Sequence, residues 1–143
     1  DTAIWRQEFY PTEHAIAGRQ GQNLEGEILG KANIKDGRND DSIVLHLQYN
    51  DFDAILTGDI TSKIEKKIIK DYQFQDIEVL KVAHHGSKHS SCNEFLNAVN
   101  PQIAIISVGK NPWGHPTKEV LERLQSIGAK ILRTDKEKIK MKI

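Results

Sequence analysis

The sequence lacks three features that would decide between broad classes of protein. It has one cysteine, Cys92, among 143 residues, so no disulfide can form within the chain and the redox compartment stays open. Its 20 Lys and Arg balance its 20 Asp and Glu, so no overall field draws it toward nucleic acid or an anionic membrane, and only a local basic patch could do so. No apolar run approaches the roughly 18 residues that a transmembrane helix needs, and no signal-peptide pattern opens the chain. We therefore expect one soluble domain without membrane contact of its own.

What the sequence has instead is a dense group of histidines in the stretch Val82-Ala83-His84-His85-Gly86-Ser87-Lys88-His89-Ser90-Ser91. Three of the six histidines of the chain lie here, directly after an apolar run. Imidazole can be a neutral metal ligand and also a proton donor near pH 7. At the end of a strand this group indicates a catalytic or metal site, and the alternative is a polar loop with no catalytic role.

From Ser42 onward the hydrophobic pattern alternates between strands and helices. Residues 43–49 have the period-two pattern of a half-buried strand, which is expected to pair antiparallel with Ala54–Thr57. Two capping boxes, Ser62-x-x-Glu65 and Ser91-x-x-Glu94, predict helix starts. The remaining expected elements are strands at 77–83, at 103–108 (covered on both faces), at 130–133 and at 138–143 (an edge with a solvated Lys face), and helices at 62–72, 91–100 and 117–127.

The pattern is weaker over residues 1–40. A short strand or helix is expected from Ile4 to Tyr10, and the glycines at 18, 21, 26 and 30 predict turns between short extended pieces. His46 lies in the middle of an expected strand, so it is expected to be structural rather than a ligand.

Three successive expected strands end in side chains that can do chemistry. Asp59 follows the second strand, His84 and His85 follow the third, and His115 follows the fourth. Because the carboxyl ends of parallel strands line one edge of a sheet, we expect these groups to meet in one crevice. Their spacing excludes a zinc finger or a His-x-x-x-His helix site and suits a catalytic metal site built from loops. The alternative for Asp59 is a helix or turn cap.

The ordered motifs Asn39-Asp40-Asp41-Ser42-Ile43-Val44-Leu45, Leu56-Thr57-Gly58-Asp59, Val79-Leu80-Lys81-Val82-Ala83-His84-His85-Gly86-Ser87, Ile105-Ile106-Ser107-Val108-Gly109 and Gly114-His115-Pro116 carry a family resemblance. Together they resemble the metallo-β-lactamase-like domain of the ComEC-type DNA-internalisation competence proteins and their soluble relatives. Leu132-Arg133-Thr134-Asp135 is also similar to the closing strand of that family. The resemblance covers roughly residues 27–135.

The resemblance implies an α/β fold, a four-layer αββα sandwich of which residues 1–143 carry only the C-terminal half, as a mixed sheet with helices on its outer face. It implies one or two divalent metal ions, Zn or Mn, at Asp59, His84 and His115, with His85 and His115 in catalysis. His84 and His85 match the paired histidines of the family, one a ligand and the other a phosphate-binding group or proton donor, and the resemblance does not say which is which.

The resemblance also gives expectations for the polar residues around the paired histidines. His89 is expected at the rim. Ser87, Ser90 and Ser91 are expected to bind substrate phosphate or to cap the next helix, and a cap is favoured for Ser91.

The HxHxDH motif of the family, which supplies up to four ligands, is absent from this chain. His14 is the only histidine before residue 46, and no second histidine lies two residues from it. We expect a fragment that is inactive without the missing N-terminal half of the domain, rather than a short member that has lost its metal centre. The persistence of Asp59, the paired histidines and Gly114-His115-Pro116 favours the fragment.

The expected function is that of a metal-dependent hydrolase, a phosphodiesterase or nuclease linked to DNA uptake, with nucleic acid or a small phosphoester as its substrate. The localisation stays open from the sequence, and attachment of this soluble domain to a bacterial inner-membrane protein is one option that the resemblance allows. The alternatives are a non-catalytic module that binds nucleic acid or a partner without a metal centre, and a hydrolase of another ester, such as a choline-phosphate esterase or a lactonase.

Overall fold

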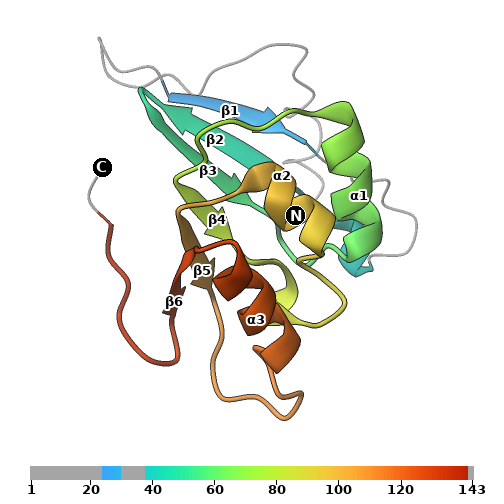
Figure 1. The fold of residues 1–143 in the computed structure, drawn as a ribbon, viewed down its shortest axis with the longest axis vertical. Helices are drawn as coiled ribbons and strands as arrows, with labels where there is room; N and C mark the ends of the chain where they lie inside the picture. Colours follow the sequence, from blue (N-terminus) through green and yellow to red (C-terminus); the bar gives the residue numbers. More distant parts are fainter. Residues whose placement is uncertain (1–23, 30–37, 142–143) are drawn as a thin grey trace, which may run out of the picture.

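The structure is a computed structural model that describes residues 24–29 and 38–141. Within these ranges six strands form a single sheet in the order β1-β2-β3-β4-β5-β6 (Figure 1). The strands are β1 (Leu24–Ile28), β2 (Leu45–Tyr49), β3 (Phe52–Leu56), β4 (Val79–Lys81), β5 (Ile103–Ile106) and β6 (Lys130–Arg133). The helices are α1 (Ser62–Asp71), α2 (Asn93–Val99) and α3 (Lys118–Ser126), with short 3-10 turns at Asn39–Asp41 and Ala83–Gly86.

The sheet is mixed, and its two parts are connected differently. Strands β1, β2 and β3 pair antiparallel, whereas β3, β4, β5 and β6 pair parallel and are joined through α1, α2 and α3. Connections between neighbouring parallel strands are right-handed, so successive helices come to lie on the same face of the sheet. Figure 1 shows the three helices side by side along that face. The expected α/β class, with a mixed sheet and helices on one side, is confirmed.

The core lies between the sheet and this helix layer. Ile55, Leu80 and Ala104 are neighbours across three strands and are fully buried. They pack with Ile68 of α1, with Phe95, Leu96 and Val99 of α2, and with Val120 and Leu124 of α3. Burial of such apolar side chains contributes roughly 1.5–3 kcal/mol each.

The other face of the sheet is more open. Lys81 and Ile105 are neighbours on it and are half-buried, and the adjacent Leu56 is exposed. The expectation that 103–108 is covered on both faces is therefore wrong within the described residues, because Ile103 and Ile105 are partly exposed while Ala104 and Ile106 are buried.

Both capping boxes are wrong, and for the same physical reason. Helix α1 begins after Thr61, whose backbone N–H and hydroxyl both donate to Asp40 Oδ1, at 3.0 and 2.6 Å. Glu65 is buried and accepts the backbone N–H groups of Ser91 and Cys92, at 2.6 and 2.9 Å. A carboxylate from α1 therefore satisfies orphan donors at the start of α2. Tertiary partners replace the local caps at both helices.

Three smaller expectations are also settled. Val44 is fully buried and Ile43 is 59% exposed, so the face expected for residue 43 is wrong at the entry to β2. His46 is structural, as expected, because its Nε2 lies 2.6 Å from Asp53 Oδ1. The expected edge strand at 138–143 is wrong for residues 138–141, which have no regular structure.

Several expectations fall outside the described residues, namely the segment Ile4–Tyr10, the turns at Gly18, Gly21 and Gly30, and residues 142–143. No helix in the ranges 24–29 and 38–141 is both long enough and apolar enough to cross a bilayer.

Candidate functional site

The side chains predicted to share one edge of the sheet do lie close together there. Asp59 follows β3, His84 and His85 lie in the turn after β4, and His115 lies in the connection from β5 to α3. His85 Nε2 is 3.8 Å from Asp59 Oδ2, and the rings of His84 and His115 meet edge to face with centroids 5.7 Å apart. We call these four residues the strand-end site. The structure arranges them as two pairs, Asp59 with His85 and His84 with His115.

An unusual backbone turn sends the two adjacent histidines to different partners. His84 and His85 both have left-handed conformations, with φ of 49° and 54°. Such a conformation costs an L residue on the order of 1–3 kcal/mol and persists only where the surroundings impose it. Here the N–H of His84 donates to Gly58 O at 3.2 Å, and the N–H of Ser87 donates to His84 O at 2.9 Å. The turn is thus tied to the Asp59 segment on one side and closed on the other.

The hydrogen bond from His85 to the backbone determines which ring nitrogen carries a proton. His85 Nδ1 lies 2.6 Å from the carbonyl oxygen of Ser107. A carbonyl can only accept, so Nδ1 is the protonated nitrogen and donates. In the neutral ring, Nε2 then presents its lone pair toward Asp59 Oδ2 across 3.8 Å. Two electron-pair donors facing each other across such a gap can share a cation between them.

Asp59 is positioned by its backbone and has a cation beside it. Its N–H donates to Ser42 Oγ at 3.1 Å. Lys81 Nζ donates to Gly58 O at 2.9 Å and lies 3.8 Å from Asp59 Oδ1. Burial lowers the pKa of Lys81, and the carboxylate of Asp59 opposes that shift. Gly58 has φ of 56°, and a Cβ there would lie 2.7 Å from Ser42 Cβ, so the turn requires glycine.

The second pair depends on the packing of two loops. The side-chain nitrogen of Asn39 lies 3.3 and 3.4 Å from the two ring nitrogens of His84. The N–H of His115 donates to Asn111 Oδ1 at 2.9 Å, and Asn111 Nδ2 donates back to His115 O at 2.8 Å. A Cβ at Gly86 would lie 2.6 Å from Pro116 Cβ, so the two loops touch at that point without room for a side chain.

Desolvation lowers the pKa of His115, and the nearby His84, His85 and His89 lower it further. Two imidazoles so close cannot both become cationic without mutual repulsion. His115 therefore stays neutral to a lower pH than an ordinary histidine, and a neutral ring nitrogen can bind a metal or accept a proton.

The loop after the paired histidines is tied down from both neighbouring helices. Arg123 of α3 donates to the carbonyl oxygens of Ser90 and Ser91, at 3.1 and 3.2 Å. Glu65 of α1 accepts the N–H of Ser91 from the other side, and burial raises the pKa of this carboxyl group despite its backbone hydrogen bonds. The loop is thus a rigid support for the turn before it.

The expected phosphate contacts from the serines are contradicted by their burial. Ser87, Ser90 and Ser91 are all buried, and Ser90 Oγ donates to Ile60 O at 2.7 Å. The favoured cap by Ser91 is also wrong, because its hydroxyl has no hydrogen-bond partner among the described residues. His89 is exposed, as expected for a rim position.

No group of three or more His, Cys, Asp or Glu side chains within 24–29 and 38–141 is arranged to hold a metal ion. The set Asp59, His84 and His115 is instead divided between the two pairs, and His85 is the histidine beside Asp59. The described residues therefore offer two donors at each pair and do not make a complete metal shell by themselves.

Sequence reasoning missed the residues that support the site, namely Asn39, Ser42, Lys81, Arg123 and Asn111. Lys81 had a local signal, because it is the one charged side chain in the apolar run 79–83. The others make contacts between segments far apart in the chain, which a local pattern does not reveal.

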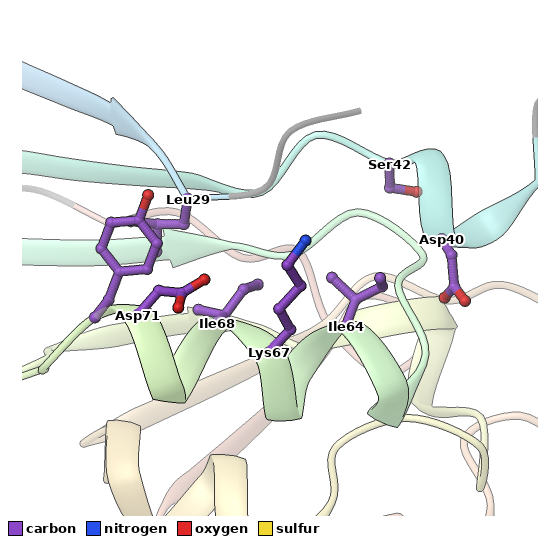
Figure 2. Close-up of a pocket in the computed structure, with 8 residues that line it drawn as sticks. Leu29, Asp40, Ser42, Ile64, Lys67, Ile68 and Asp71 are labelled. Carbon is purple, nitrogen blue, oxygen red and sulfur yellow. The ribbon is translucent and has the colours of Figure 1, made fainter. Parts of the chain in front are cut away.

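A cavity of about 270 Å³ lies between α1 and the segment around Asp40, and none of the four residues of the strand-end site lines it. Figure 2 shows its lining, with Ile64, Lys67 and Ile68 on the helix and Asp40 and Ser42 at one end. Ser42 accepts the N–H of Asp59, and Asp40 accepts the N–H of Thr61 at the start of α1, so two residues of this lining help to position the Asp59 segment.

Comparison with known proteins finds similarity to much longer chains. No family model matches. The chain is 40% identical over 99 residues to ComE operon protein 3 of Bacillus subtilis (strain 168), over 68% of this chain and 13% of that protein. It is 39% identical over 135 residues to Competence protein ComA of Neisseria gonorrhoeae, over 90% of this chain and 19% of that protein. It is 38% identical over 105 residues to Recombination protein 2 of Haemophilus influenzae, over 72% and 13%.

The names of these relatives suggest a competence-related family, and the chain spans less than a fifth of the length of each of them. The similarity therefore supports a competence-related family and concerns one part of each relative.

Proposed function

We propose that this protein is a metal-dependent hydrolase of the metallo-β-lactamase superfamily that cleaves phosphodiester bonds in nucleic acid during DNA uptake. The observation that carries the proposal is the meeting of Asp59, His84, His85 and His115 at the carboxyl ends of three neighbouring strands. The name of Competence protein ComA supports the biological setting.

A metal ion is part of the proposal, but the described residues alone do not complete its shell. Asp59 and His85 present two donors 3.8 Å apart, which suits a shared divalent ion such as Mn²⁺ or Zn²⁺. The proposal thus needs at least one further donor from outside the described residues.

The chain's own residues have roles that follow from their positions. Lys81 places a positive charge beside Asp59, where an anionic substrate would be drawn. His84 and His115 present imidazoles that can hydrogen-bond a phosphate oxygen. An anionic phosphate beside His115 favours its protonated form, so this ring can take up a proton and pass it to the leaving oxygen.

The test is to purify the full-length protein, measure its bound metal, and assay the cleavage of DNA, a small phosphodiester and a lactone with Mn²⁺ or Zn²⁺. We expect bound metal, cleavage of DNA above the other substrates, and loss of cleavage in Asp59→Asn. A protein that binds neither ion and cleaves neither DNA nor the phosphodiester would refute the proposal. Selective cleavage of the lactone would identify a different hydrolase.

One observation favours a second candidate, a module that binds nucleic acid or a partner without catalysis. The described residues contain no complete metal-binding group. Undiminished function of Asp59→Ala in a transformation assay would favour this candidate over the hydrolase.

A further inference from the structure

Trp113 is the most exposed of the large hydrophobic side chains in the described part of the chain. It is 75% exposed and lies in the connection from β5 to α3, which Figure 1 shows in orange beyond the end of the sheet. A single exposed apolar residue is common on protein surfaces and needs no explanation by itself. Trp113 differs because of where it lies. His115 is two residues away, so the backbone positions of the two are at most about 7 Å apart.

The backbone around Trp113 is held in one shape. Asn111 Nδ2 donates to Gly109 O and His115 O, at 2.9 and 2.8 Å, and Asn111 Oδ1 accepts the N–H of His115 at 2.9 Å. Pro112 and Trp113 form the tip of the turn that these bonds close, and Gly114 follows with φ of 73°. A side chain at the tip of a closed turn points outward without the loop having to rearrange.

The two ends of the connection are fixed as well. Thr117 N–H donates to Gly86 O at 2.9 Å, which joins the connection to the turn that carries His84 and His85. Val108 N–H donates to Thr134 Oγ1 at 2.8 Å on the other side. The backbone that carries Trp113 is therefore held in a fixed position relative to the loop of His84 and His115, which helps a residue there to orient a substrate.

Among the described residues the ring contacts involve other side chains, His46 with Phe74 and His84 with His115. The face of the Trp113 indole is thus open to a ligand. Lys110 in the same loop is exposed and can contact a phosphate. An aromatic face together with a cation is the combination that binds single-stranded nucleic acid, because bases stack on the ring and the backbone is neutralised beside it.

We propose that Trp113 stacks on an unpaired nucleobase next to the phosphodiester bound at the strand-end site, so that the site selects single-stranded over double-stranded DNA. The inference rests on the proposed action on nucleic acid. Stacking requires the face of a base, which a duplex covers with its neighbouring base pairs. Trp113 is thus a positioning residue for the substrate and takes no part in the chemical step.

The experiment measures binding without turnover. The full-length protein, in EDTA, is titrated with a fluorescein-labelled 12-mer of thymidine, with a 12-mer of abasic sites that has the same backbone charge, and with a 12-base-pair duplex. The variants are Trp113→Ala, Trp113→Phe, Lys110→Ala and, as a control, Met141→Ala, which removes another exposed large hydrophobic side chain.

We expect Trp113→Ala to weaken binding of the thymidine 12-mer roughly 5- to 100-fold and to leave the abasic 12-mer unchanged. Trp113→Phe should recover most of the affinity, and Met141→Ala should have none of this effect. Lys110→Ala should weaken both single strands equally and reduce the salt dependence.

Equal binding of the thymidine 12-mer by wild type and Trp113→Ala would overturn the inference, as would an equal loss for the abasic strand. These outcomes do not depend on catalysis. If the protein cleaves no phosphodiester but Trp113→Ala still loses affinity for the thymidine 12-mer selectively, the proposed hydrolase function is refuted and the stacking role is supported. If it cleaves DNA and Trp113→Ala binds the thymidine 12-mer normally, the stacking role fails and the hydrolase stands.

Discussion

In the pair of Asp59 and His85, hydrogen bonds fix the His85 ring and the Asp59 backbone. In the pair of His84 and His115, the placement of the two rings depends on the packing of two loops. In the first pair, the carbonyl of Ser107 determines the protonation of the His85 ring, and Ser42 holds the backbone of Asp59. In the second pair, Asn111 and the contact between Gly86 and Pro116 do the positioning. The comparison teaches that one site can combine a pair fixed by hydrogen bonds with a pair that depends on both hydrogen bonds and close packing between two loops.

The largest effect is expected from breaking the packed pair at Gly86. A Cβ in Gly86→Ala would lie 2.6 Å from Pro116 Cβ at a φ of 81°, so both steric overlap and backbone strain oppose it. The variant should lose about 3 kcal/mol of unfolding free energy, measured by urea denaturation. Gly109→Ala is the matched control. A Cβ there meets nothing within 4 Å, so it should change stability by less than about 0.5 kcal/mol. Equal losses in the two variants would contradict the close packing at Gly86.

A smaller effect is expected from Asn111→Ala, which loosens the same pair without a steric clash. It removes three side-chain hydrogen bonds, one to Gly109 and two to His115. We expect a loss of about 2 kcal/mol and a clear change in the NMR signals of the His115 ring. The signals of the His85 ring should stay in place, because the Ser107 carbonyl holds that ring independently. If the signals of both rings moved equally, the two pairs would not be independently built.

The matched change in the other pair, Ser42→Ala, should cost less. It removes the one acceptor of the Asp59 N–H, with the expected loss near 1 kcal/mol by urea denaturation. Here the NMR signals of the His85 ring should respond and those of the His115 ring should not. If Ser42→Ala lost more unfolding free energy than Asn111→Ala, the expected order of the two effects would be wrong.

The smallest effect concerns pH. Because desolvation and the neighbouring histidines lower the pKa of His115 from 6.5, the unfolded chain takes up this proton before the folded chain does. The free energy of unfolding should therefore fall as the pH drops below about 6.5. It should stop falling once the pH is below the pKa that His115 has in the folded protein. His84→Asn removes one of the causes, so an NMR titration should find the pKa of His115 raised in that variant. An unchanged pKa would show that the rings do not interact.

The order of elements from β2 to β6 could be predicted from the sequence, because apolar runs and the periodic spacing of apolar residues indicated each strand and helix. The meeting of Asp59 with the paired histidines and His115 was also predictable, since neighbouring parallel strands bring their carboxyl ends together. The pairing within the site was not. It depends on the left-handed backbone conformation of His84 and His85, which no local sequence pattern predicts. The capping boxes failed because Asp40 and Glu65 reach across the fold to partners that lie far away in the sequence.

The central claim is that both pairs act on one phosphodiester bond. The most direct test is a double-mutant cycle on DNA cleavage by the full-length protein in Mn²⁺, with Asp59→Asn, His115→Asn and the combination. Groups that act as a unit are strongly non-additive, so each single change should lower kcat about 100-fold or more and the double change should be little worse than the more severe single one. Wild-type cleavage by either single variant would contradict the claim.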